Sequence, residues 1–193
     1  MPRRFVEFLL ASLFLVCALA CGAPPSKELH QAQGAIDAAR AAGADDYARE
    51  DYDAAVTALA RAEQAVSERD YRLALSQALD SRERAQAAAK LAASQKAQVR
   101  SEAERLLAQV TSIVAVAADR VAADGAKTPT AAIATLEDAI ASARTALDDA
   151  GKALASEDYL EARRRLEGVG VALNAAMQAL PAPAPPRPAR RTR

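Results

Sequence analysis

Apolar residues recur at alternating spacings of three and four through most of the chain between residues 26 and 180. This period places one apolar stripe along each helix and is typical of helices that pack along their length. Ala, Leu, Arg, Glu and Gln dominate the same region, and these residues favour helices. The pattern therefore predicts an all-α protein. Its successive stripes begin at Leu29, Tyr52, Tyr71, Ile133 and Tyr159.

The third stripe is the longest and predicts one continuous helix. It starts at Tyr71, passes through Leu75, Ala78 and Arg82, and continues to Ala117 without a Gly or Pro. At about 1.5 Å per residue, the helix would be roughly 80 Å long. The helices before and after it are shorter, so each is expected to lie antiparallel to one part of it. The predicted fold is an elongated antiparallel helical bundle, made of two three-helix units that share the long helix.

Two segments with the same pattern mark the joins between helices. AVSERDYRLA begins at Ala65 and ALASEDYLEA at Ala153, and in both the apolar stripe skips five positions before the Tyr. Each residue turns a helix by about 100°, so a step of five moves the stripe roughly 140° around the axis. A continuous helix could not keep one packed face across such a step. Neither join contains Gly or Pro, which leaves an unbroken helix as the alternative, but the step in the stripe favours a tight turn at each join.

The turns are expected at residues 67–70 and 156–158, where Ser and Asp supply turn and capping groups. A Tyr follows the last Asp of each turn, and we expect its ring to wedge between helix ends while its hydroxyl reaches water. Both Asp-Tyr-x-x-Ala starts resemble tetratricopeptide helix starts, although the 34-residue period is absent. The predicted structural turn residues are Asp70, Tyr71, Asp158 and Tyr159.

Other helix boundaries follow from capping residues and glycines. Ser26 is the expected N-cap of the first helix, which should end near Gly43 and leave Tyr47 in a loop. After a loop at 124–128, Pro129 suits the first turn of the fourth helix.

The last predicted helix contains two glycines, Gly168 and Gly170. Each is isolated between other residues, so neither belongs to a Gly-rich phosphate loop. We expect both to permit close helix packing.

The start of the chain has the three parts of a secretory signal. A basic start with Arg3 and Arg4 precedes an apolar run over 8–20, and small residues surround Cys21. The apolar run is shorter than the about 20 residues that a spanning helix needs. The sequence ALAC, which ends at Cys21, resembles the lipobox of bacterial lipoproteins, in which the cysteine thiol receives a diacylglycerol and becomes the mature N-terminus.

On this interpretation Cys17 leaves with the signal, so a disulfide with Cys21 is not expected. An unmodified Cys21 would instead be a free thiol in an oxidising compartment. Gly22 follows the cysteine. In this respect the chain resembles bacterial lipoproteins that lack Asp at this position and are sent to the outer membrane by default. The predicted segments are a signal at 1–20, a lipidated linker at 21–25, a helical unit with the long helix at 26–124, a hairpin that packs on it at 125–180, and a disordered tail at 181–193.

Charge and composition exclude some partners. The chain carries 25 basic and 25 acidic residues, and several of the basic residues fall in the signal and the tail, so the helical body is mildly acidic. It has no basic stripe of the kind that binds nucleic acid. The tail PAPAPPRPARRTR is expected to be extended. Its cations could contact an anionic surface through Arg187, Arg190, Arg191 and Arg193.

The sequence offers little for catalysis or metal binding. His30 is the only histidine, which excludes a His-based triad or a multi-His metal site within one chain. Paired carboxylates such as Asp148 and Asp149 point about 100° apart on a helix and make a poor metal clamp. We expect no cofactor, no small-molecule substrate and no enzymatic activity.

One stretch resembles a known family. The resemblance rests on four short stretches: AI at Ala35, ARAAGA from Ala39, YA at Tyr47 and DY at Asp70. In these the chain resembles a domain-of-unknown-function family of short helical Gram-negative outer-membrane lipoproteins. Members often carry Pro after the Tyr-Ala pair, where this chain has Arg49. Some are followed by an OmpA-like peptidoglycan-binding domain, which this sequence does not show. The resemblance implies location and helical fold only.

Two functions remain open at this point. The first is a lipid-anchored periplasmic scaffold of the bacterial cell envelope, attached to the membrane through its N-terminal lipid. The second is an adaptor whose helical hairpins bind an envelope protein or peptide in a groove. The apolar stripes are expected to be consumed by packing, which favours the scaffold. The expected partners are the membrane and either envelope proteins or an anionic envelope polymer.

Overall fold

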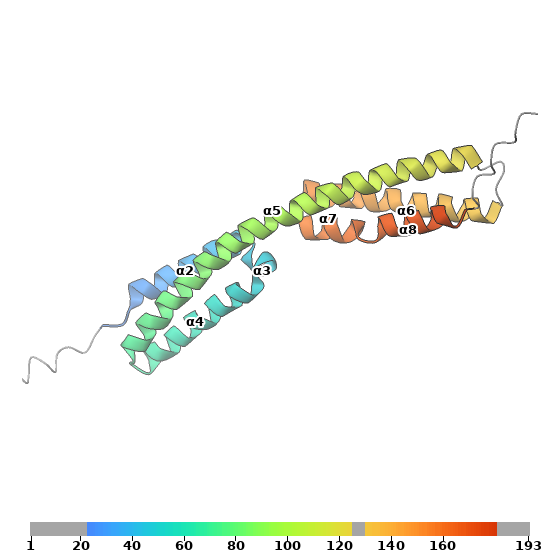
Figure 1. Ribbon diagram of the computed structural model, residues 1–193. Coiled ribbons are helices and arrows are strands. Elements are labelled where there is room, and N and C mark those ends of the chain that lie inside the picture. Colours follow the sequence, from blue (N-terminus) through green and yellow to red (C-terminus); the bar gives the residue numbers. More distant parts are fainter. Residues whose placement is uncertain (1–22, 125–129, 181–193) are drawn as a thin grey trace, which may run out of the picture. The chain divides into compact units, whose positions relative to one another are not determined.

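The structure is a computed structural model that describes residues 23–124 and 130–180 (Figure 1). All regular structure in these ranges is helical, so the predicted all-α class is confirmed. The signal segment with Cys21, most of the predicted 124–128 loop with Pro129, and the tail after Leu180 lie outside the described residues. The helices are α2 (Ser26–Ala41), α3 (Ala44–Tyr47), α4 (Arg49–Ser67), α5 (Tyr71–Asp124), α6 (Thr130–Ala155), α7 (Tyr159–Leu166) and α8 (Val169–Gln178).

Two compact units divide the long helix α5 between them. Unit 1 runs to Gln95, and its core joins α2, α3 and α4 to the first part of α5. Unit 2 begins at Lys96, and its core joins the remainder of α5 to α6, α7 and α8. The helix is shared as predicted. The boundary falls inside α5 and not after residue 124, because each part of α5 packs against its own set of helices.

Small side chains form the buried seam of α5 in unit 1. The seam residues are all 0% exposed and recur at spacings of four and three, the period of closely packed helices. Ser81 Oγ donates a hydrogen bond of 2.8 Å to the carbonyl oxygen of Ala55 in α4, so the two backbones approach closely at this point. The seam is formed by Ala74, Ala78, Ser81, Ala85, Ala88 and Ala92.

The predicted stripe on this part of α5 was therefore only partly right: Ala78, Ala85 and Ala92 lie in the seam as predicted, but Leu75 and Arg82 do not. Leu75 is 38% exposed and Arg82 is half-buried, while their neighbours Ala74 and Ser81 are fully buried. A close approach of α4 needs side chains no larger than Ala or Ser along the contact line. Leucines are displaced to the flanks of that line.

Two predicted boundaries in unit 1 also need correction. Ser26 is the first residue of α2 and its side chain makes no capping hydrogen bond, because Pro25 occupies the N-cap position. Tyr47 closes the short helix α3 and does not lie in a loop. Gly43 is needed before α3, since its φ of 82° is left-handed and an added Cβ would lie 3.2 Å from Tyr47 Cδ2.

The C-terminal helix of unit 2 is broken, whereas the sequence pattern predicted one helix from Tyr159 to Leu180. Glu167 is extended, with ψ of 128°, and Gly168 has a left-handed φ of 79°, so α7 ends and α8 starts anew. Gly170 has the predicted packing role, because a Cβ there would lie 3.1 Å from Ile113 Cδ1 on α5; Gly168 does not, because a Cβ there would have no atom within 4 Å.

Candidate interaction surfaces

Most of the residues predicted to contact a partner fall outside the described residues. These are the proposed lipidation site Cys21 and the tail cations Arg187, Arg190, Arg191 and Arg193. The described part of the chain shows the predicted turn residues, a set of charged contacts around Tyr159, a groove in unit 2 and exposed apolar side chains.

The first predicted turn joins α4 to α5 in a Schellman motif. Asp70 N–H donates to the carbonyl of Ala65 at 2.9 Å, and Arg69 N–H donates to that of Val66 at 3.0 Å. Asp70 then caps the next helix, because its Oδ1 accepts a 2.9 Å hydrogen bond from the N–H of Leu73. One aspartate thus ends one helix and begins the next.

The second predicted turn has the same geometry between α6 and α7. Asp158 N–H donates to the carbonyl of Ala153 at 2.9 Å, and Glu157 N–H donates to that of Leu154 at 3.2 Å. Asp158 Oδ1 accepts a 3.1 Å hydrogen bond from the N–H of Glu161. The structure therefore places both turns, and both capping aspartates, where the repeated segments predict them.

The two tyrosines after the turns differ in environment. Tyr159 is 7% exposed, and the cations of Lys96 and Arg100 lie 5.5 and 5.8 Å from the centroid of its ring. Tyr71 is only half-buried. Tyr52 resembles Tyr159 more closely, because it is buried and its hydroxyl accepts a 2.8 Å hydrogen bond from Arg40 Nε.

Ion pairs on the surface of unit 2 connect α7 to its neighbours. Arg163 Nη1 lies 3.2 Å from Glu102 Oε2 of α5, and Arg165 Nη1 lies 3.3 Å from Asp149 Oδ2 of α6. Arg165 Nε also donates to Glu161 Oε1 at 2.6 Å, and this hydrogen bond holds the pKa of Glu161 below its ordinary value. These contacts lie at the surface and are partly open to solvent, so each adds little to stability.

The carboxylate pair predicted to be a poor metal clamp is engaged by cations. Lys152 Nζ donates to Asp148 Oδ2 at 2.6 Å, and this hydrogen bond raises the pKa of Lys152. Asp149 is paired with Arg165. Across residues 23–124 and 130–180, no group of three or more His, Cys, Asp or Glu side chains is placed to hold a metal ion. His30 is exposed on α2.

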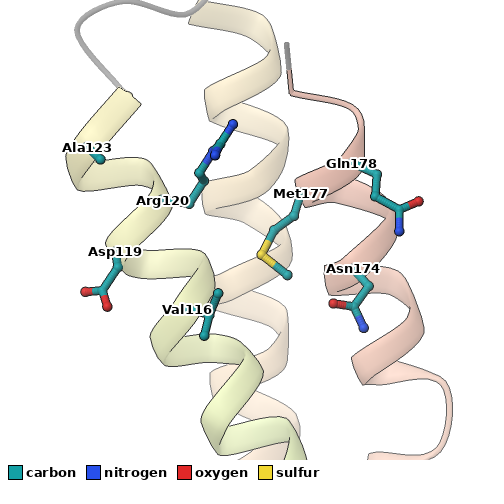
Figure 2. A pocket seen from close by; sticks show the side chains of 7 residues that line it. All are labelled: Val116, Asp119, Arg120, Ala123, Asn174, Met177 and Gln178. Carbon is teal, nitrogen blue, oxygen red and sulfur yellow. The ribbon is translucent and has the colours of Figure 1, made fainter. Parts of the chain in front are cut away.

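A groove of about 480 Å³ lies between α5 and α8 in unit 2 (Figure 2). Figure 2 shows Val116 on α5 and Met177 on α8 pointing toward the groove from opposite sides, whereas the Asp119 carboxylate points away from α8. Polar side chains complete the lining. The full lining is Val116, Asp119, Arg120, Ala123, Asn174, Met177 and Gln178.

The sequence pattern did not predict this groove, because the apolar stripes were expected to be consumed by packing and the apolar residues beside the stripes were not considered. Val116 is 56% exposed and Val171 is 74% exposed. A signal was present in the composition of α8, whose sequence VGVALNAAMQ carries apolar residues around most of its circumference, apart from the side that holds Asn174 and Gln178. A helix packed on one side only must expose some of them.

Further large apolar side chains are exposed in unit 1. They sit on α4 and on α5 beside the alanine seam, and each is between 38% and 42% exposed: Val56, Leu73, Leu75, Leu79 and Leu91.

The long helix also contains the one described segment that is long and apolar enough to cross a membrane by length and composition. That segment is Tyr71–Ala123, with a mean hydropathy of 1.5 over its most apolar window. The same helix supplies Val110, Val114 and Ala117 to the core of unit 2. Length and composition are shared by spanning helices and by helices that pack in a bundle, so the property does not distinguish the two.

Comparison with known proteins adds no relative: no family model, no curated protein and no solved structure matches this chain.

Proposed function

We propose that this protein is a non-enzymatic, lipid-anchored scaffold lipoprotein of the bacterial envelope, held at the outer membrane and facing the periplasm. The observation that carries the proposal is the sequence ALAC at Ala18–Cys21, which follows a basic start and an apolar run too short to span a bilayer. The resemblance to short Gram-negative lipoproteins supports the same location.

The described architecture suits a scaffold. Both units are built on α5, their cores are formed largely by helix–helix contacts of small and aliphatic residues, and in unit 2 two ion pairs join α7 to α5 and to α6. The start of α2 at Ser26 brings the folded part of the chain close to the proposed lipid. A protein of this form would position whatever it binds near the membrane surface.

The lipid anchor is tested by changing the two cysteines separately. Cys21→Ser should abolish incorporation of a labelled fatty acid and release the protein from the membrane fraction. Cys17→Ser is the matched control and should retain both properties, because Cys17 is removed with the signal on this proposal. A Cys21→Ser protein that stays in the membrane fraction at high salt would contradict the lipoprotein assignment.

A second candidate function is an adaptor that binds an envelope protein or peptide. The groove between α5 and α8 favours it, because Val116 and Met177 present apolar surface there that no helix of the described part of the chain covers. A photoreactive amino acid at Met177 should form one reproducible crosslink in intact cells. The same group at Val56, an exposed apolar position of unit 1, is the control, and equal crosslinking from both positions would argue against a groove-specific partner.

We also propose that the tail cations bind an anionic envelope polymer. Arginine guanidinium groups pair well with phosphate and carboxylate, and the contact should weaken as salt increases. Removal of residues 181–193 should lower co-sedimentation with isolated envelope material at low salt. Unchanged co-sedimentation would leave the tail without this role.

A further inference from the structure

Two leucines are exposed near the start of α5. Leu75 is 38% exposed and Leu79 is 40% exposed, while Ala74 and Ala78 beside them are fully buried. The exposed pair lies one helical turn apart on the same side of the helix. Large apolar side chains at this level of exposure form a small contact surface when they lie together.

Cations surround these leucines. At about 100° per residue, Arg72, Leu75, Leu79 and Arg82 fall within a sector of roughly 80° around α5. The Arg72 side chain is exposed, and Glu83 is the acidic residue that borders the sector.

Helix α2 adjoins the same side of α5. Arg82 Nη1 donates a 2.8 Å hydrogen bond to Gln31 Oε1 of α2. Lys27 lies one turn before Gln31 on that side of α2 and is exposed. The two helices thus form one surface, which we name the basic leucine face, composed of Lys27, Arg72, Leu75, Leu79 and Arg82.

The chain topology places this face at the end of unit 1 where the N-terminal segment enters. Helix α2 reverses into α4 through Gly43 and α3, as the hydrogen bond from Arg40 to Tyr52 shows, and α4 reverses into α5 at Arg69. Two reversals make α2 and α5 parallel, so the start of α2 and the α4–α5 turn lie at the same end (Figure 1).

The distance from this end to the proposed lipid is short. The chain from Cys21 to Ser26 spans at most about 17 Å even when it is fully extended. A lipid on Cys21 would therefore hold the start of α2 within that distance of the bilayer surface. Basic helices with a few large apolar residues bind such surfaces by inserting the apolar side chains while the cations meet anionic headgroups.

We propose that the basic leucine face lies on the anionic lipid surface of the membrane in which Cys21 is anchored, an inference that rests on the proposed lipoprotein function. The face and the anchor would then act as two attachments, and unit 1 would rest against the bilayer. The occupant is the lipid surface, since the cations match anionic headgroups and the chain entry brings this face to them.

The absence of Trp from the chain permits a specific test. Leu75→Trp and Leu91→Trp are matched reporters, because both leucines are 38% exposed on α5 and they point about 160° apart. The full lipidated protein would be reconstituted into phosphatidylethanolamine vesicles containing phosphatidylglycerol, with brominated acyl chains as quencher. We expect a blue shift and strong quenching for Leu75→Trp, and little of either for Leu91→Trp.

Flotation of the same samples reports the lipid anchor independently. If both variants float and their tryptophans are equally fluorescent, the basic leucine face does not contact the membrane. This result would overturn the proposal and leave the lipoprotein function intact. Protein that does not float would overturn both. The proposal is supported if the fluorescence of Leu75→Trp is quenched by bromolipid but not by acrylamide. Resistance to both quenchers would mean that protein, either another segment of the chain or a second copy, covers the face, which overturns the proposal.

The charged part of the proposal has its own pair of variants. Arg72→Gln should reduce bromolipid quenching of Leu75→Trp, and raised salt should do the same. Arg84→Gln removes one cation from the opposite side of α5, where Arg84 pairs with Asp80, and should leave the quenching unchanged. Equal quenching in vesicles of phosphatidylethanolamine alone would overturn the anionic requirement.

Discussion

Arg69 and Glu157 adopt the same left-handed backbone conformation, each with a φ of 61°, at equivalent places in two separate turns. Both occupy the C′ position of a Schellman motif, which Gly fills in most proteins. Neither residue can relieve the steric conflict of a Cβ in this conformation. Both turns are therefore stabilised by the hydrogen bonds around them and not by the residue at the strained position.

Arg69→Gly should stabilise the protein by about 1 kcal/mol, because Gly adopts a positive φ without the clash that an L side chain meets. The control is Arg72→Gly in the first turn of α5, which should destabilise by about 1 kcal/mol, since Gly is a poor helix former. Urea unfolding followed by circular dichroism measures both. A loss of stability in Arg69→Gly would mean that the arginine side chain contributes more than the strain costs.

Asp158→Ala should destabilise the protein by about 1 kcal/mol, the usual cost of losing an N-cap. Its Oδ1 accepts the hydrogen bond from the N–H of Glu161, and Ala has no acceptor to replace it. Asp158→Asn keeps an acceptor oxygen and should lie close to the parent protein in the same unfolding measurement. If Asn and Ala cost the same, the capping bond is not the source of the stability.

The turns were predictable from the sequence because a five-residue step in the apolar stripe, followed by Asp-Tyr, is a local signal. The buried positions of α5 in unit 1 were predictable only in part. Hydrophobicity ranks Leu75 above Ala74 as a core residue, yet Ala74 is buried. The buried positions are decided by how closely α4 approaches α5. That distance depends on the sizes of the side chains on both helices, so the apolar pattern of one helix alone cannot predict it.

The break between α7 and α8 shows a different limit. Gly168 fits a helix interior or a left-handed break equally well by its sequence context, and the choice depends on how α8 must turn to pack on α5 and α6. Helix α8, which follows this break, lines the groove together with α5, through Met177 and Val116. Whether an apolar side chain stays exposed between two helices depends on how these helices pack. The pattern along one helix therefore could not reveal the groove.

Tyr159→Ala should destabilise the protein by about 3 kcal/mol, the low end for removing a buried aromatic ring. The ring is 7% exposed and lies near two cations, so its loss also removes the contacts with Lys96 and Arg100. Tyr71→Ala is the matched change at the equivalent position and should cost about half as much, because Tyr71 is half-buried. Thermal unfolding compares the two, and equal losses would contradict the difference in packing.

Ser81→Leu should destabilise unit 1 by about 2 kcal/mol, because overpacking a tight contact forces helices apart. Ser81 is 0% exposed, and its hydroxyl reaches the backbone of α4. Ser81→Ala loses one hydrogen bond without adding volume and should cost about 1 kcal/mol. Leu75→Ser is the control, because Leu75 is 38% exposed on another side of α5, and it should alter stability less than Ser81→Leu. Amide hydrogen exchange in α4 locates the effect, and unchanged protection there in Ser81→Leu would contradict the close contact.

Glu161 should make a pH-dependent contribution to stability. The hydrogen bond from Arg165 lowers the pKa of Glu161 in the folded protein, so the folded state binds this proton less readily than the unfolded state. The contribution is therefore fully present above the ordinary glutamate pKa and is lost as the pH falls through the lowered folded value. Removing the carboxylate should abolish this dependence, whatever else it does to the ion pairs.

Glu161→Gln should accordingly have a lower midpoint of thermal unfolding than the parent at neutral pH, and the difference should close as the solution is acidified. Glu167→Gln is the control, because Glu167 is exposed and the described residues show it in no ion pair. Since Glu161 and its partners lie at the surface, the difference should also shrink in high salt. A gap between Glu161→Gln and the parent that stays constant from neutral to acidic pH would show that the glutamate acts through packing and not through its charge.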